Sequence, residues 1–183
     1  MLVNRIQLAD GNPVFLIDEF FTEEIMSTLQ IICDAFTKDN PAWTCPQGFN
    51  SSRWVYDCAT TEFAPVADYI KSSEFADQIS SLIGHPVWSS NTSMWVDFTG
   101  IGALRPHKEQ AGGFLAQVFV TRTTDTLNGT TFYNAARQVL FQLPYRNNLG
   151  WLFEGDRVVH GRQSDVPTGL SRFSIMMWFA TTP

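Results

Sequence analysis

Basic residues and cysteines are both scarce in this chain of 183 residues. It has 12 Lys and Arg against 18 Asp and Glu, which gives a formal net charge of -6. Nucleic-acid binding depends on Lys and Arg side chains that neutralise phosphates, so this balance argues against nucleic acid as a partner. Cys33, Cys45 and Cys58 are odd in number and show no CxxC spacing. A disulfide framework and a cysteine zinc site are therefore not expected, and a reducing cytoplasm is the predicted location.

Long apolar runs are also missing. No stretch reaches the roughly 18 consecutive apolar residues of a membrane span, and the first residues lack the long apolar segment of a secretory signal. We therefore expect no membrane association. The composition is 44% hydrophobic and 16% charged, with fifteen Phe and six Trp. A packed globular protein is indicated, and its length predicts a single domain over 1–183.

The first 86 residues carry helical patterns. The segment "VFLI" is a strand candidate, and Thr22 follows as an N-cap with acidic residues in the next turn. Apolar residues then recur at helical spacing up to Phe36, which predicts an amphipathic helix that ends before Pro41. A second helix is predicted in "SSEFADQISSLIGHP", where Gly84 is the stop signal.

The segment between these two helices, "AWTCPQGFNSSRWVYDCATTEF", mixes turn residues with aromatics. Such a loop either contacts a ligand or packs on the core through its Trp residues. In the first case, Arg53 and the aromatic residues Trp43, Phe49 and Trp54 form a lid over the substrate. The sequence leaves both interpretations open.

From position 87 onward the chain consists of short segments rich in Val, Phe, Trp, Thr and Ile, divided by Gly, Asn and Pro. This pattern predicts roughly eight short antiparallel strands. Helices followed by strands indicate an α+β fold in which 1–86 gives helical support and 87–183 forms a sandwich or jelly-roll core.

The chain has three histidines, His85, His107 and His160, so few are available to bind a metal. His107 and Glu109 are two positions apart, so in a strand both side chains point to the same face. His85 lies at a helix end, whereas His160 follows a strand candidate and precedes a glycine. Two histidines and one carboxylate are the ligands of non-haem Fe(II) oxygenases. The His-x-Glu spacing alone is weak, because such a pair is more often a solvated strand face.

The order of several motifs strengthens this interpretation. "GIGALRPHKE" precedes the apolar segment "GFLAQVFVT" and the turn "NGTTFYN", and "GWLFEGDRVVHG" precedes "SRFSIMMWF". This succession resembles the prolyl-4-hydroxylase-like branch of the Fe(II)/2-oxoglutarate-dependent oxygenases. The resemblance implies a double-stranded β-helix (jelly roll) core with the N-terminal helices packed on one sheet.

The resemblance also implies a role for individual residues. His107, Glu109 and His160 would hold Fe(II), and Arg172 would bind the distal carboxylate of the cosubstrate 2-oxoglutarate. A guanidinium fork suits that task, although Arg162 is a nearer competitor. Hydroxyl contacts to the cosubstrate would come from Tyr133, Thr131 or Ser174, which the sequence does not rank.

The implied activity is that of a 2-oxoglutarate-dependent dioxygenase that uses O2 to hydroxylate a peptidyl proline, a free amino acid or a small metabolite. Glu109 departs from the more common aspartate by one added methylene group, so its carboxylate must either bend back or shift the metal. A carboxylate at this position nevertheless favours hydroxylation over halogenation, because halogenating relatives lack that ligand. The alternative function is a non-catalytic binding module on the same scaffold; a cupin-type isomerase would need more histidines than the chain has.

Overall fold

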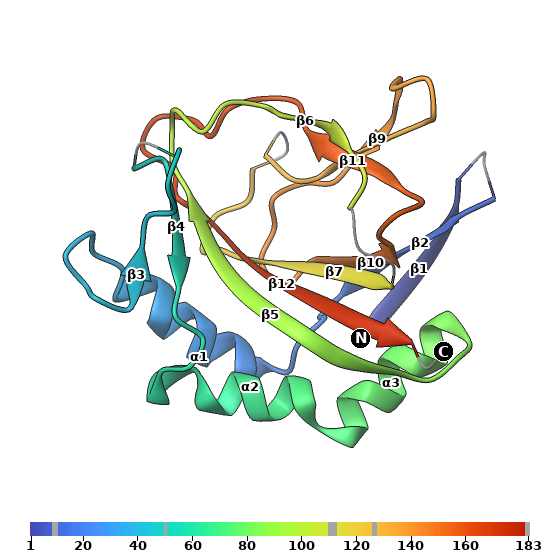
Figure 1. The fold of residues 1–183 in the computed structure, drawn as a ribbon, viewed down its shortest axis with the longest axis horizontal. Helices are drawn as coiled ribbons and strands as arrows, with labels where there is room; N and C mark the ends of the chain where they lie inside the picture. The colour runs from blue at the N-terminus through green and yellow to red at the C-terminus, as the bar shows by residue number, and fades with distance from the viewer. Residues whose placement is uncertain (9–10, 50, 110–112, 126–127, 182–183) are drawn as a thin grey trace.

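Two antiparallel β-sheets and a layer of helices make up the fold (Figure 1). The structure is a computed structural model and describes 1–183 apart from 9–10, 50, 110–112, 126–127 and 182–183. The strands of the large sheet, in spatial order, are β1 (Leu2–Gln7), β2 (Pro13–Asp18), β10 (Gly150–Glu154), β7 (Phe114–Val120), β12 (Arg172–Thr181), β5 (Val87–Asp97), β4 (Arg53–Tyr56) and β3 (Trp43–Thr44). The small sheet runs β6 (Leu104–His107), β11 (Val159–Arg162), β8 (Thr131–Tyr133) and β9 (Val139–Gln142).

The helices cover one face of the large sheet, below β5 and β12 in Figure 1. They are α1 (Glu23–Asp34), α2 (Ala64–Lys71) and α3 (Ser73–Ile83), with a 3-10 turn at Thr61–Phe63 before α2. The Thr22 hydroxyl accepts from the N–H of Ile25 at the start of α1, and Gly84 ends α3 with a positive φ of 85°. Both signals predicted from the sequence are confirmed. No helix in the described part of the chain is long and apolar enough to span a membrane.

Strand alternation divides the interior into two cores. On β12, Phe173, Ile175, Met177 and Phe179 pack toward the helices in the first core, and the residues between them point to the opposite face. Strand β7 alternates in the same way: Val118 faces the helices, whereas Leu115 and Phe119 belong to the second core. The large sheet therefore has an apolar face under the helices and a second face that looks toward the small sheet.

The predicted fold class is confirmed, and the eight strands expected after position 86 correspond to β5–β12 within the described residues. The first 86 residues contribute more than helical support, because β1 to β4 extend both edges of the large sheet. The side chains of β1 are mostly exposed, so buried and exposed residues do not alternate along it. Strands β3 and β4 lie in the segment expected as a loop, where two short strands separated by turn residues give little periodicity.

Gly161 lets the two short strands β6 and β11 approach closely. A Cβ atom built at Gly161 would lie 2.5 Å from the carbonyl oxygen of Leu104 and 3.1 Å from that of Arg105. Both obstacles are backbone atoms, so they cannot rotate away as a side chain does. The register of β6 on β11, and with it the position of His107 opposite His160, depends on a glycine at this place.

We expect Gly161→Ala to lower the free energy of unfolding by about 1–3 kcal/mol, because the added methyl group forces these backbones apart. Urea denaturation measures this loss. Gly169→Ala is the control: its added methyl group meets nothing within 4 Å, so the cost is only that of its positive φ of 83°, about 1 kcal/mol. A Gly161→Ala protein as stable as the wild type would contradict the close approach of the strands.

Candidate metal centre and cosubstrate cavity

His107 and His160 lie side by side on two adjacent strands of the small sheet. They are register partners on β6 and β11, and their ring centroids are 4.5 Å apart. The Nδ1 atom of His107 lies 2.9 Å from the carbonyl oxygen of Arg105, and that of His160 lies 3.3 Å from the carbonyl oxygen of Val158. A carbonyl can only accept, so these contacts favour the proton on Nδ1. Each Nε2 is then left with a free lone pair, as a metal ligand requires.

Glu109 completes the group from just beyond the end of β6. Its Oε1 atom lies 3.6 Å from Nε2 of His107 and 3.4 Å from Nε2 of His160. The strand was expected to continue through Glu109, but it ends at His107, and the N–H of Glu109 instead donates to the carbonyl oxygen of Gly155. This bond holds the carboxylate beside both rings without regular strand pairing.

The contacts between Glu109 and the two imidazole rings set the charge of its carboxylate. The contact with His107 lowers the pKa of Glu109 most, followed by that with His160, and together they outweigh burial and bring it to about 2. The same contact with Glu109 raises the pKa of His107. Glu109 is therefore ionised at neutral pH and offers a negative charge at the point where the two Nε2 atoms converge.

The donor set fits a divalent transition metal. One ligand atom from each of His107, Glu109 and His160 lies within 4.8 Å of the others. Two ligand atoms that bind one ion at about 2.1 Å are roughly 3–3.5 Å apart, which is close to the Nε2–Oε1 distances found here. Imidazole nitrogens with one carboxylate suit Fe(II), and three protein ligands leave coordination positions free. The structure thus brings together the three residues that the sequence singled out, whereas His85 lies elsewhere, with its ring 5.4 Å from Phe114.

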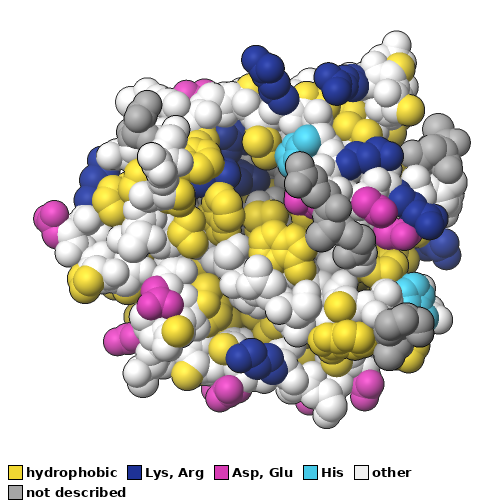
Figure 2. All heavy atoms as spheres, viewed as in Figure 1, with side chains coloured by type: hydrophobic (Ala, Val, Ile, Leu, Met, Phe, Trp, Pro, Cys, Tyr) yellow, Lys and Arg dark blue, Asp and Glu magenta, His cyan; other side chains and the backbone are white. Residues whose placement is uncertain are grey.

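These candidate ligands line a cavity of about 230 Å³ between the two sheets. Figure 2 shows a hollow in this face with hydrophobic side chains in it, basic side chains deeper in and a histidine at its rim. His160 is buried with 5% of its side chain exposed, whereas His107 is 37% exposed and lies nearer to solvent. Besides the three ligands, the cavity is lined by Arg53, Trp95, Asp97, Leu104, Gln117, Thr130, Trp151, Gly161, Arg162, Arg172, Met176 and Trp178.

A buried carboxylate organises the basic end of this cavity. Asp97 is the register partner of Arg53 on β4 and of Arg172 on β12, so the three form a row across adjacent strands. Arg53 donates to both Asp97 oxygens, at 2.5 and 2.8 Å, and Arg172 lies 3.5 Å away. Arg162 reaches the same carboxylate from the small sheet at 3.1 Å. Asp97 therefore links the two sheets by ionic contacts.

The two arginines considered for binding the cosubstrate differ in how many of their N–H groups are free. These are Arg162 and Arg172. Arg162 donates Nε to Ser164, Nη1 to Asp97 and Nη2 to the carbonyl oxygen of Gly102. Among the described residues, the hydrogen bond of the Arg172 guanidinium is from Nε to the carbonyl oxygen of Asn128 at 2.7 Å, and its Nη1 atom lies 3.5 Å from Asp97. Burial lowers the pKa of Arg172 to about 10, so its guanidinium remains charged at neutral pH. Of the two, Arg172 has the N–H groups available for a ligand carboxylate.

The three hydroxyl candidates lie in different places. Ser174 is on the cavity face of β12, where its oxygen accepts from Gln117 Nε2 at 3.0 Å. Thr131 and Tyr133 flank Phe132, which packs in the second core, so alternation directs both of them to the opposite face of β8. Among the described residues, Ser174 thus adjoins the cavity through Gln117, whereas Thr131 and Tyr133 are not part of its lining.

Sequence reasoning missed a polar chain that crosses the cavity wall. Trp151 Nε1 donates to the Thr130 hydroxyl, the hydroxyl donates to Gln117 Oε1, and Gln117 Nε2 donates to Ser174. Gln117 is a polar residue in the otherwise apolar strand "FLAQVFV". That single interruption is the signal in the sequence that points to this wall, since a buried polar side chain requires partners.

The segment proposed as a substrate lid divides between core and cavity. Trp43 is buried in the first core, and Trp54 packs against that core. Arg53 instead lines the cavity and stacks on Trp95, with its guanidinium carbon 4.3 Å from the ring centroid. Of the residues considered for the lid, Arg53 is the one whose side chain lines the cavity.

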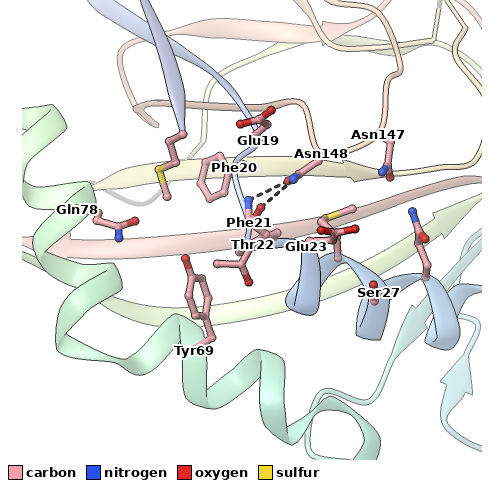
Figure 3. A pocket seen from close by; sticks show the side chains of 13 residues that line it. Glu19, Phe20, Phe21, Thr22, Glu23, Ser27, Tyr69, Gln78, Asn147 and Asn148 are labelled. Carbon is pink, nitrogen blue, oxygen red and sulfur yellow. Dashed lines mark hydrogen bonds between the residues drawn. The ribbon is translucent and has the colours of Figure 1, made fainter.

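A larger hollow of about 660 Å³ lies at the start of α1 (Figure 3). The Asn148 side chain accepts from the N–H of Phe21 and donates to its carbonyl oxygen, so it fixes the chain entering the helix. Glu19 and Glu23 are among the lining residues. Within the described residues, the three potential metal ligands His107, Glu109 and His160 line the smaller cavity of about 230 Å³. We therefore expect the reaction to take place there and not in the larger hollow.

This chain is similar to known proteins in structure and not in sequence. No protein-family model matches the chain, and no curated protein sequence does. Solved structures do match it: an oxidoreductase of the 2OG-Fe(II) oxygenase family from Burkholderia pseudomallei is 7% identical, covers 91% of this chain and 84% of its own, and gives a TM-score of 0.68. A prolyl-4-hydroxylase from Pseudomonas putida is 14% identical over 93% of each chain, with a TM-score of 0.65.

A third similar structure is HygX from Streptomyces hygroscopicus, which was solved with nickel and 2-oxoglutarate bound. It is 9% identical, covers 94% of this chain and 84% of its own, and gives a TM-score of 0.63. These likenesses over nearly the whole chain show that this protein has the double-stranded β-helix fold of the 2-oxoglutarate/Fe(II) oxygenases. The predicted resemblance to that superfamily is thereby confirmed at the level of the fold.

We expect Asp97→Asn to destabilise the protein by about 3–5 kcal/mol at pH 7, because three guanidinium groups lose their shared counter-ion. Burial alone would raise the pKa of Asp97, but the hydrogen bonds and charge of Arg53, together with Arg172 and Arg162, hold it below its usual value of 3.8. The stabilisation is therefore present above pH 3.8 and is lost as the pH falls through the folded-state pKa.

Urea unfolding of the wild type and Asp97→Asn between pH 7 and pH 3 measures this effect. The stability difference between the two proteins should be constant above about pH 5 and should shrink at lower pH. A difference that stays constant throughout this range would show that the ionised carboxylate does not stabilise the fold.

Proposed function

We propose that the protein is a non-haem Fe(II)- and 2-oxoglutarate-dependent dioxygenase that hydroxylates a small molecule or a peptide. The observation that carries this proposal is the convergence of His107, Glu109 and His160 in the same cavity as the buried guanidinium of Arg172. A metal site with open positions and a cation for a distant carboxylate are the two features that a chelating dicarboxylate cosubstrate needs.

Each residue has a defined task in this proposal. His107, Glu109 and His160 hold Fe(II), and the carbonyl oxygens of Arg105 and Val158 keep both imidazole rings oriented through Nδ1. When bound, Fe(II) with 2-oxoglutarate and O2 supplies the oxidant for a substrate C–H bond. Arg172 receives the distal carboxylate of the cosubstrate, and Ser174 orients Gln117, which lines the cavity beside it.

The protein also controls access of water. The cavity wall contains Trp95, Trp151, Met176 and Trp178, which are large apolar side chains. Phe119 lies under Arg172, with the guanidinium carbon 4.9 Å from its ring centroid. Desolvation by these groups strengthens the ionic contact between Arg172 and a bound carboxylate. His107, the more exposed ligand, marks the side from which the substrate enters.

Peptides and small molecules are both supported as substrates by the similar structures. HygX has been solved with hygromycin B, and a Trichoplax adhaerens prolyl hydroxylase has been solved with a peptide fragment. The non-catalytic alternative is less well supported, because a scaffold without chemistry would have no need for three converging ligands beside a guanidinium with free donors.

We expect His107→Ala and His160→Ala each to abolish the visible absorption band that forms when Fe(II) and then 2-oxoglutarate are added without oxygen. Each change removes one of three protein ligands. His85→Ala, which removes the remaining histidine at a distance from the site, is the matched control and should form the band normally. If His160→Ala formed the wild-type band, the ligand assignment would be wrong.

We expect Arg172→Ala to weaken 2-oxoglutarate binding by about 10–100-fold, the range for losing charged hydrogen bonds. Iron binding should persist, since Arg172 is not a ligand. Titration of 2-oxoglutarate into the Fe(II)-loaded variant measures the affinity through the same band. Arg162→Lys is the comparison, because the donors of Arg162 are already used within the protein; a larger effect there than in Arg172→Ala would reverse the assignment.

A further inference from the structure

Arg53 is a second guanidinium of the cavity with unused donors. Its Nε and Nη2 atoms donate to Asp97, and in the described part of the chain its Nη1 atom makes no hydrogen bond. The guanidinium lies 4.3 Å from the ring centroid of Trp95 and 5.2 Å from that of Phe49. These contacts fix its plane, so Arg53 is preorganised for a partner in the cavity that it lines.

The charges around Arg53 are not balanced within the cavity. Asp97 is shared among three arginines, and the other acidic residue of the lining, Glu109, is engaged with the two histidines. Asp165 also acts on Arg162, but it is half-exposed and its oxygens accept from the N–H groups of Gly100, Gly102 and Val166. Once 2-oxoglutarate pairs with Arg172, Arg53 and Arg162 still share the single carboxylate of Asp97, so the lining keeps one more cation than anion at this end of the cavity.

Arg53 also differs from Arg172 in its access to solvent. Its side chain is 15% exposed, whereas that of Arg172 is 6% exposed. The two are separated by Asp97 in the row across β4, β5 and β12. A cosubstrate held deep in the cavity by Arg172 therefore leaves the donors of Arg53 on the more accessible side, where a substrate would lie.

We propose that Arg53 binds an anionic group, such as a carboxylate, of the molecule that this protein hydroxylates. This inference rests on the proposed function and specifies the substrate class. The apolar part of such a substrate would contact Trp95 and Leu104, which line the same cavity. Arg53 acts as a specificity residue: it selects an acidic substrate and fixes its orientation through a charge-assisted hydrogen bond.

The test uses propionate and propionamide, which have the same number of heavy atoms and differ in charge. Both are titrated into protein loaded with Zn(II) and saturating 2-oxoglutarate, so that Arg172 and the positions of the metal that bind 2-oxoglutarate are already occupied. Saturation-transfer NMR on the methyl protons of each probe measures its binding. Ionic strength is held constant with NaCl, because exposed charges are screened by salt.

The variants are Arg53→Gln, Arg53→Lys and Arg122→Gln. Arg122 is the matched control, because it also donates through Nε and Nη2 to one carboxylate, that of Asp34, but lies on the surface. Arg53→Lys keeps the charge with a different geometry and should retain part of the binding. It also keeps the test valid if Arg53→Gln folds poorly.

We expect propionate to bind and propionamide to bind at least about tenfold more weakly, the size of one charged hydrogen bond. Arg53→Gln should weaken propionate binding by a similar factor and leave 2-oxoglutarate affinity within about twofold, and Arg122→Gln should change neither. Equal binding of the two probes, no binding of propionate to the wild type, or unchanged binding in Arg53→Gln would each overturn the proposal. So would a loss of 2-oxoglutarate affinity in Arg53→Gln as large as that in Arg172→Ala.

The Fe(II)/2-oxoglutarate absorption band of the wild type separates this inference from the proposed function. If the band forms and propionate binding does not depend on Arg53, the dioxygenase proposal stands and the acidic substrate class is wrong. If the band does not form, the dioxygenase proposal fails; Arg53-dependent binding of propionate would then still establish the anion site.

Discussion

The geometry of the cavity depends on the ion pairs that the buried carboxylate of Asp97 forms with three arginines. This carboxylate receives Arg53 and Arg172 from neighbouring strands of the large sheet and Arg162 from the small sheet. A charge in this position is costly to desolvate, and only several cations together compensate for that cost. The arrangement therefore stabilises the contact between the sheets and, at the same time, concentrates basic groups beside the candidate metal ligands.

The two faces of the large sheet carry different kinds of side chain. Toward the helices, β12 and β7 present apolar side chains that fill the first core. Toward the small sheet, the same strands present Arg172, Ser174 and Gln117. Because alternating residues point to opposite faces, one strand serves both purposes without compromise. Substitutions on the second face thus alter the cavity while leaving the packing under the helices intact.

The protein is acidic overall, whereas its cavity is basic, and the two charges act on different partners. A net charge of -6 gives nucleic acid no general footprint, yet the cavity gathers three arginines within reach of one aspartate. A buried cationic pocket in an acidic protein selects small anions that fit inside it over large polyanions that bind to the outside. This contrast agrees with a dicarboxylate cosubstrate and with a substrate that carries its own anionic group.

The sequence by itself determined the helix caps at Thr22 and Gly84 and the strand-rich second half, because these follow from local spacing and residue chemistry. It also singled out His107, Glu109 and His160 as candidate metal ligands, through the order of its motifs and not through local spacing. Tertiary structure decided the rest. It added β1, β3 and β4 to the large sheet, because these strands are short or exposed and have no strong period. It also distinguished Arg172 from Arg162 by their hydrogen bonds. Asp97 had no local signal, and the sequence named Arg53 only as part of a candidate lid. Their pairing arises from strands more than forty residues apart that meet only in the folded sheet.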